Sequence, residues 1–156
     1  MPSDLQTTYR GYLAAVVAYN HTVAAHLDIG YTDYQAMNVL QLHDGLATGE
    51  LARLVGLSTS AATRMVDRLE RLGYVSRSAD PQDRRRTIVR LGKTQPARLY
   101  ETLQVVRSLV GDAFEGLSPA ELEVLERHFT KARDGYQTAT NLLLDRQASD
   151  DGSDKP

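Results

Sequence analysis

The chain has 156 residues, a formal net charge of −2 and no cysteine, which excludes disulfides, thiolate metal sites and cysteine nucleophiles. With 42% hydrophobic and 24% charged residues it is long enough to bury a core, so we expect a single globular unit. Its apolar runs are all shorter than the roughly 18 residues of a membrane span, and no basic-then-apolar leader opens the chain. We therefore expect a cytoplasmic protein.

The first region, residues 1–31, is expected to form one long helix. Apolar side chains recur there at helical spacing, and the pattern ends near Gly30. The next segment, "TDYQ", is typical of a capping box in which Thr32 caps a second helix and Gln35 reaches back. That second helix is expected to end by residue 44.

Two short helices joined by the turn "GLS" come next. The first, "GELARLVG", is expected to start at a Thr48 cap and to close at Gly56, and the second, "TSAATRMVDRLERLG", to start after Ser58 and to close at Gly73. Two helices in this arrangement predict a helix-turn-helix. One side of the second helix is aliphatic, and the exposed side near its N-terminus is hydroxylated and basic. The side chains there are Thr59, Ser60, Thr63 and Arg64.

A pair of strands is predicted after the helix-turn-helix. Residues 74–75 and 88–89 are β-favouring runs on either side of the polar turn "DPQDRRR". This turn is longer than a tight hairpin requires, and such loops often carry function. The hairpin tip therefore presents Arg84, Arg85 and Arg86 on an arm. Asp83 is expected to pair with an arginine and stiffen the tip.

Two long helices are predicted from residue 93 to residue 146. Thr94 is expected to cap the first, whose apolar residues advance alternately by four and three in a heptad pattern. "SPAE" predicts a capping box that begins at Ser118, and the last helix continues the same pattern. The tail, residues 147–156, has no apolar anchor and is expected to be disordered.

The middle of the chain is basic although the whole chain is slightly acidic. From Asp44 to Leu91 there are nine arginines and six acidic residues, a net charge of +3, so the remainder carries −5. Arg68 and Arg71 are expected to pair with Asp67 or Glu70, or to contact phosphates at the periphery. A solvated surface with uneven charge remains an alternative.

A helix-turn-helix followed directly by a hairpin is a winged helix, and its parts suit duplex DNA. The exposed helix face fits the major groove, where Arg64 can reach a guanine edge with two hydrogen bonds. A guanidinium on the arm fits the strongly negative minor groove. The arginine cluster therefore predicts a DNA contact.

The segment "LARLVGLSTSAATRMVDRLERLGYVSR", followed by "DPQDRRR" and "IVRL", resembles the MarR family of bacterial winged-helix regulators, and the order of helices is similar over nearly the whole chain. The resemblance implies a mainly α fold with a small β-hairpin wing. It divides the chain into an N-terminal dimerisation helix (1–31), a winged helix-turn-helix lobe (32–92) and C-terminal dimerisation helices (93–146). It also implies a homodimer that binds successive major grooves of a pseudo-palindromic operator. The implied DNA contacts are Thr59, Ser60, Thr63, Arg64, Arg84 and Arg85, with Arg86 as a further wing position.

The resemblance also raises the question of a small-molecule site. The family commonly binds small aromatic or phenolic anions between the dimerisation helices and the DNA-binding lobe. The corresponding pocket here would draw on Tyr12, Asn20, His21, Tyr34 and Met37. Core packing is the alternative explanation for the tyrosines.

We expect neither a metal site nor a cofactor. His21 and His26 are five residues apart and lie on different faces of a helix, whereas two ligands on one helix require a spacing of three or four. A zinc site, which some members of the family have, is the alternative. No phosphate-binding glycine-rich loop, nucleophile elbow or paired histidine and carboxylate motif is present, so an enzyme is not expected.

The predicted function is a homodimeric, sequence-specific transcriptional regulator, usually a repressor in this family, that a small ligand could release from its operator. One alternative is a ligand-insensitive architectural protein that coats DNA with little sequence preference. The other is a protein-interaction module that has kept the fold and lost DNA binding. The sequence reveals neither the operator and the regulated genes nor the effector, and it does not separate repression from activation.

Overall fold

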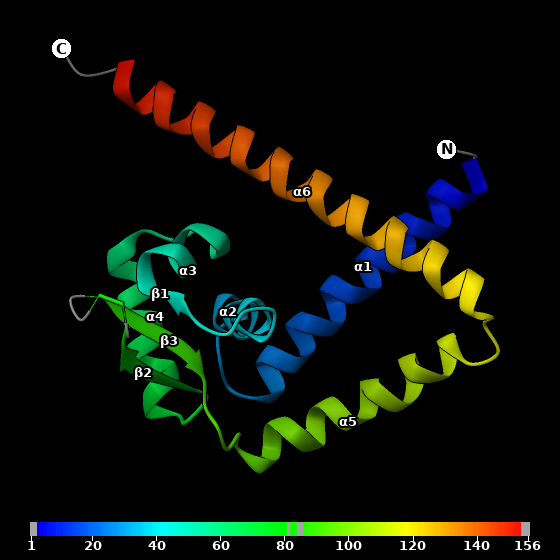
Figure 1. Cartoon of the computed structure of the whole chain (residues 1–156), viewed down its shortest axis with the longest axis horizontal. Helices are drawn as coiled ribbons and strands as arrows, with labels where there is room; N and C mark the ends of the chain where they lie inside the picture. Colours follow the sequence, from blue (N-terminus) through cyan, green and yellow to red (C-terminus); the bar gives the residue numbers. More distant parts are fainter. Residues whose placement is uncertain (1–2, 81, 84–85, 154–156) are drawn as a thin grey trace. The chain divides into compact units, whose positions relative to one another are not determined.

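The computed structural model of the chain describes residues 3–80, 82–83 and 86–153, with side chains up to residue 146. The described residues are mostly helical and include one small antiparallel sheet, which confirms the predicted fold class (Figure 1). The chain divides into two compact units, Met1–Arg107 and Ser108–Pro156. None of the described helices is both long and apolar enough to cross a membrane.

The first unit consists of the helix-turn-helix lobe and the helices on either side of it in sequence. In chain order its elements are α1 (Ser3–His26), α2 (Tyr31–Gln41), β1 (Leu46–Ala47), α3 (Thr48–Val55), α4 (Thr59–Arg71), β2 (Val75–Ala79), β3 (Thr87–Leu91) and most of α5 (Ala97–Gly111). The second unit contains the end of α5, the short 3-10 helix η1 (Asp112–Phe114) and α6 (Pro119–Ser153). The predicted helix-turn-helix is the pair α3 and α4.

The sheet has the strand order β1-β3-β2, so β3 is central and β2 is an edge strand. β2 and β3 form the predicted hairpin, with Val75 opposite Leu91 and Ala79 opposite Thr87. The sequence does not predict β1, because two residues are too few to show the alternation of a strand. β1 forms by pairing with the other edge of β3, and it ties the segment before α3 to the hairpin.

The turn before β1 depends on Gly45. Its φ of +118° lies in a region that residues with a side chain rarely adopt. A Cβ atom at this position would lie 2.6 Å from Cγ2 of Ile88 on β3. Glycine therefore lets the backbone pass close to the central strand, and β1 can then pair with β3.

The core of the first unit lies where α2, α3, α4 and the sheet meet. Its most deeply buried large apolar side chains are Leu40, Leu51, Met65, Val66, Leu69 and Val89. The end of α1 and the start of α5 add further buried side chains, among them Val23, Leu27 and Leu99. Because α4 contributes through one apolar face, its orientation is fixed and its other face is exposed.

The start of α2 differs from the prediction. The helix begins at Tyr31, and the N–H of Gly30 donates to the carboxylate of Asp33 at 3.1 Å. The predicted cap at Thr32 is therefore wrong. The reason is that a carboxylate in the first turn accepts an otherwise unpaired N–H and also interacts favourably with the helix dipole.

Of the caps predicted for the next two helices, the cap of α3 is wrong and the cap of α4 is confirmed. Glu50 accepts the N–H of Ala47 at 3.0 Å, which places Thr48 inside α3 and not at its cap. Ser58 is confirmed as the cap of α4, because its Oγ accepts the N–H of Ala61 at 3.3 Å. The start of α4 is thus fixed by its own sequence.

The predicted capping box of α6 is confirmed. Ser118 donates its backbone N–H to Oε2 of Glu121 at 2.8 Å, and the Ser118 Oγ accepts the N–H of Glu121 at 3.4 Å. The Ser118 Oγ also donates to Oε2 of Glu121 at 2.6 Å, and this bond, followed by the bond from the Ser118 backbone N–H, lowers the pKa of Glu121.

The end of α6 differs from the prediction. We expected the helical region to stop at residue 146, but α6 continues to Ser153. The segment lacks an apolar anchor, yet it also lacks a helix breaker before Gly152, so the backbone ladder continues. The last three residues of the predicted disordered tail, 154–156, lie outside the described residues.

Candidate nucleic-acid interface

The recognition helix α4 presents one buried face and one exposed face. The left-handed conformation of Gly56, with φ +71°, ends α3 and turns the chain toward α4. The buried face of α4 consists of Ala62, Met65, Val66 and Leu69. The predicted DNA contacts on α4, namely Thr59, Ser60, Thr63 and Arg64, are all exposed. The fold therefore brings these four side chains together at the N-terminal half of α4.

The hydroxyl groups of Ser58, Ser60 and Thr63 at this end of α4 are already hydrogen bonded. Thr63 Oγ1 donates to the carbonyl of Thr59 at 2.9 Å, and the Oγ atoms of Ser58 and Ser60 lie 3.2 Å apart. A hydroxyl that donates its only hydrogen keeps its lone pairs as acceptors. In this state Thr63 suits an amino group on a base edge better than a phosphate, which needs a donor.

Two arginines of α4 are available to a partner. Arg64 and Arg71 are exposed, and among the described residues no acidic side chain pairs with either. Arg64 lies in the N-terminal half of the helix and Arg71 is its last residue. Of the described arginines on α4, Arg64 is therefore the one placed beside the hydroxyl groups.

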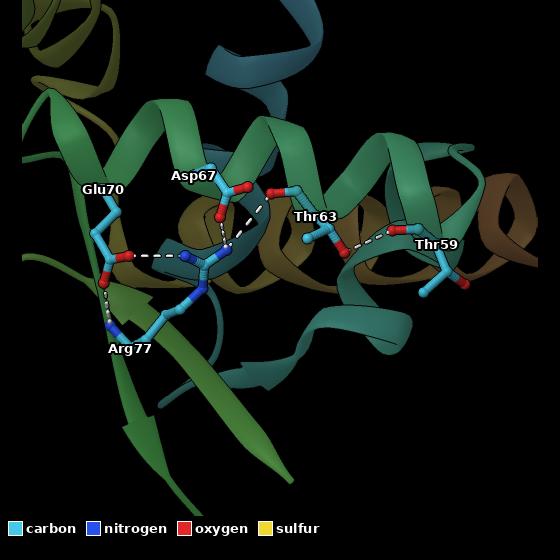
Figure 2. A network of polar contacts seen from close by, with 5 residues as sticks. All are labelled: Thr59, Thr63, Asp67, Glu70 and Arg77. Carbon is cyan, nitrogen blue, oxygen red and sulfur yellow. Dashed lines mark hydrogen bonds and ion pairs between the residues drawn. The ribbon is translucent and has the colours of Figure 1, made fainter.

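Arg77 on β2 forms ion pairs with Asp67 and Glu70, the two acidic residues on the exposed side of α4 (Figure 2). Its Nη2 lies 2.6 Å from Asp67 Oδ1, and its Nη1 lies 2.7 Å from Glu70 Oε2. Burial by itself would lower the pKa of Arg77, but the hydrogen bonds to the two carboxylates outweigh it and raise the pKa. The pairing of these acids with Arg68 or Arg71 that the sequence suggested does not occur among the described residues.

Arg68 pairs instead with Asp33 at the start of α2. Its Nε and Nη2 donate to the two carboxylate oxygens at 2.8 and 2.5 Å. Asp33 is only 1% exposed and also accepts the Gly30 N–H, so one buried carboxylate joins the start of α2 to α4. The hydrogen bond to Asp33 raises the pKa of Arg68. The sequence analysis did not predict this pair. The signal that could have indicated it is the position of Asp33, an acidic residue directly before the buried apolar residues of α2.

The described part of the wing tip is held by backbone and side-chain bonds. The N–H of Asp80 donates to the carbonyl of Arg86 at 3.0 Å, and the N–H of Arg86 donates to the carbonyl of Asp83 at 2.8 Å. The Asp80 carboxylate accepts the N–H of Gln82 at 2.8 Å. Nη2 of Arg86 lies 3.1 Å from Oε1 of Glu50, which connects the wing to α3.

The two remaining wing arginines, Arg84 and Arg85, lie outside the described residues. Their contact with DNA stays a prediction, and so does the expected pairing of the Asp83 side chain with an arginine. Arg86 is half exposed beside its partner Glu50. The hydrogen bond from the Ala47 N–H, and then the proximity of Arg86, hold the pKa of Glu50 below its ordinary value.

A cavity of about 130 Å³ lies between α2, β3 and α5 in the first unit. Of the five side chains predicted for a ligand pocket, Tyr34 and Met37 line it, whereas Tyr12, Asn20 and His21 do not. Other lining residues include Leu91, Gln95, Leu99, Leu103 and Arg107. Burial raises the pKa of Tyr34, so its hydroxyl stays neutral at physiological pH. The single chain thus brings together only part of the predicted pocket.

The histidine of the predicted pocket has a different neighbour. The rings of His21 and Tyr31 are stacked, with centroids 3.9 Å apart. Throughout the described residues, no group of three or more His, Asp or Glu side chains is arranged to hold a metal ion.

Comparison with known proteins agrees with this geometry. Residues 31–87 match the model of the MarR family. The uncharacterized HTH-type transcriptional regulator YcgE of Bacillus subtilis (strain 168) is 29% identical over 136 residues, which cover 85% of this chain and 88% of the relative.

Two solved structures of mutant MepR proteins from S. aureus share the fold. One mutant, from a multidrug resistant clinical isolate, has a TM-score of 0.70 at 18% identity, over 87% of this chain and 99% of that chain. A second mutant, which was solved bound to an oligodeoxyribonucleotide, has a TM-score of 0.54 at 19% identity, over 85% of this chain and 97% of that chain.

The helix-turn-helix and its β-hairpin define a winged-helix protein. The family match places it more closely: residues 31–87, which span the helix-turn-helix and most of the hairpin, are of the MarR type. The chain is therefore a DNA-binding transcriptional regulator and not an enzyme.

Proposed function

We propose that the chain acts as a homodimeric repressor that recognises a pseudo-palindromic operator by its base sequence. The observation that carries this proposal is the position of Arg64, which is exposed beside Thr63 and has no acidic partner among the described residues. A guanidinium can donate two parallel hydrogen bonds to O6 and N7 of guanine in the major groove. Such a regulator acts where the DNA is, so we also propose a cytoplasmic location.

The other proposed contacts surround Arg64 on two elements. Thr59, Ser60 and Thr63 approach bases or phosphates from α4. Arg84, Arg85 and Arg86 at the hairpin tip are proposed to enter the minor groove, whose negative potential attracts guanidinium groups. Together these contacts require α4 and the wing to keep a fixed relative position.

A second copy of the chain is proposed because the second unit and the end of α5 expose many apolar side chains. None of the described side chains of α6 is buried. The exposed apolar residues of these helices include Leu109, Val110, Phe129, Tyr136, Leu142 and Leu143. A hollow of about 490 Å³ in the second unit is lined by Phe114, Leu122, Leu125 and Phe129 among others. Apolar surface of this extent marks an interaction site, and a two-fold dimer would cover it while presenting two α4 helices to DNA.

Regulation by a small aromatic or phenolic ligand remains part of the proposal. Its support is the cavity lined by Tyr34 and Met37, which is mostly apolar in its lining side chains and also has polar groups from Gln95 and Arg107. A ligand there changes DNA binding only if its affinity differs between the DNA-binding and the non-binding state.

The function is tested by comparing two arginines on the same helix. With a duplex selected from random sequence, Arg64→Ala should reduce the preference for that duplex over scrambled DNA by about 1 to 3 kcal/mol, because it removes a base contact. Arg71→Ala is the matched control at the end of α4. It should weaken binding to the two duplexes by the same factor or leave both affinities unchanged. Equal losses on both duplexes for Arg64→Ala would show that Arg64 is a phosphate contact and not a base reader.

A further inference from the structure

Arg77 lies where the free edge of the sheet meets the recognition helix. β2 is an edge strand, and the N–H groups that point away from β3 have no partner within the sheet. The backbone N–H of Arg77 is satisfied instead by Glu70 Oε1 at 3.1 Å. Main chain and side chain of Arg77 therefore both bind the same carboxylate on α4.

The guanidinium of Arg77 also reaches along α4 (Figure 2). Beyond Asp67 and Glu70, its Nη2 lies 3.5 Å from the carbonyl oxygen of Thr63. Residues 63, 67 and 70 are spaced by four and three, so they form one line on the helix surface. Thr63 in turn donates to the carbonyl of Thr59. The contacts thus run from the wing strand to the end of α4 that carries the proposed DNA contacts.

The charge of Arg77 is fully matched by its neighbours. Two carboxylates lie within 2.7 Å of its nitrogen atoms, and its side chain is only 24% exposed. A guanidinium held in this way has few donors left for a phosphate. Its planar fork is suited to bridge two carboxylates at once, which the single ammonium group of a lysine cannot reproduce.

We propose that Arg77 is a positioning residue for DNA recognition. It fixes the angle between α4 and the wing, so that the base contacts of α4 and the minor-groove contact of the wing can form at the same time. This inference rests on the proposed function. Two other roles would also explain the contacts: Arg77 could simply neutralise Asp67 and Glu70 near the phosphates, or it could stabilise the whole lobe.

A double-mutant cycle between Arg77 and Arg85 separates these roles. Arg77→Lys keeps the charge and removes the fork. In the otherwise native chain, Arg85→Ala should weaken binding to the selected duplex about tenfold, whereas in the Arg77→Lys background it should weaken binding less than about threefold, because coupled residues are not additive. Equal factors in both backgrounds would overturn the proposal.

The matched control is an arginine with a similar ion pair away from the wing. Arg98 Nη1 lies 2.8 Å from Asp28 Oδ2, and both side chains are at least half exposed. Arg98→Lys should leave the effect of Arg85→Ala unchanged. An equal loss of coupling with Arg98→Lys would show that the cycle reports a general effect of losing an arginine ion pair, and would overturn the assignment to Arg77.

Hydrogen exchange of the free, full-length protein gives a reading that does not depend on DNA. Arg77→Lys should speed exchange of backbone amides in the hairpin, residues 75–91, and leave α2 and the buried turns of α3 as in the native chain. Faster exchange throughout the lobe would indicate general stabilisation, and unchanged exchange in the hairpin would indicate that Arg77 does not hold the wing. Either result overturns the proposal. If Arg85→Ala has no effect in the native chain, the wing contact of the proposed function fails, and hydrogen exchange still decides the role of Arg77.

Discussion

The DNA-binding lobe and the second unit use apolar residues in opposite ways. In the lobe, Leu69 and Val89 are completely buried. In α6, Leu142 and Leu143 are more than half exposed. Apolar side chains that are buried within the chain stabilise its fold, whereas a row of apolar side chains left exposed indicates a partner. The lobe is therefore complete within one chain, whereas the apolar surface of the second unit is left for a partner, which we propose is a second copy.

The largest effect is expected from a charge placed on the exposed apolar face. Phe129→Asp should convert the proposed dimer to monomers, because it introduces a carboxylate into a surface that association would bury. Sedimentation velocity measures the change. Thr138→Asp, a charge of the same sign at an exposed polar position of α6, is the control and should leave the dimer intact. A Phe129→Asp protein that sediments like the native chain would mean that this face is not the interface.

The second prediction contrasts one leucine from each region. Leu69→Ala should lower the free energy of unfolding by about 2 to 5 kcal/mol, since it leaves a cavity in the core. At protein concentrations where the chain is monomeric, Leu142→Ala should change the free energy of unfolding by less than about 0.5 kcal/mol, as surface substitutions do. Urea unfolding at several protein concentrations checks both values. A large, concentration-independent cost for Leu142→Ala would mean that a single chain buries this residue.

The third prediction concerns the buried carboxylate that joins α2 to α4. Arg68→Ala should lower the free energy of unfolding by about 2 to 4 kcal/mol, because it removes the cationic partner of a buried carboxylate. Arg71→Ala, three residues further along α4, should cost less than about 0.5 kcal/mol. Urea unfolding of the two variants gives the difference. Similar costs would show that the pair with Asp33 does not hold α4 in place.

The smallest effect is expected from Glu50. Its pKa is lower in the folded chain than the ordinary 4.5, so its contribution to stability is present above that value and is lost as the pH falls below it. Glu50→Gln should therefore reduce the loss of stability between about pH 6 and pH 3, by a small amount because the side chain is exposed. Urea unfolding at a series of pH values measures it. An unchanged acid dependence would mean that the bonds to Ala47 and Arg86 do not survive in solution.

The sequence predicts those parts of the fold whose signals are local. The helix-turn-helix, the Ser58 cap and the hairpin follow from spacing and from turn residues within a few positions of each other. The exposed hydroxyl and arginine side chains at the start of α4 follow from the same helical period. These features need no information from distant parts of the chain.

The sequence does not predict contacts between distant residues. β1 is visible only through its pairing with β3, and Asp33 meets Arg68 across 35 positions. Asp67 and Glu70 have arginines beside them on α4, yet Arg77 from the wing reaches them instead. Which of several nearby charges pairs with which depends on how β2 crosses α4, and that geometry is set by the packed core.

We propose that two copies of this chain read a specific duplex. The most direct measurement is to select binders from random duplex DNA with the purified protein and then to titrate the selected duplex against scrambled sequence at physiological salt. We expect an inverted repeat that is bound by two copies and preferred by at least about a thousandfold. Equal, strongly salt-dependent binding to both duplexes would contradict it and would describe an architectural protein that coats DNA.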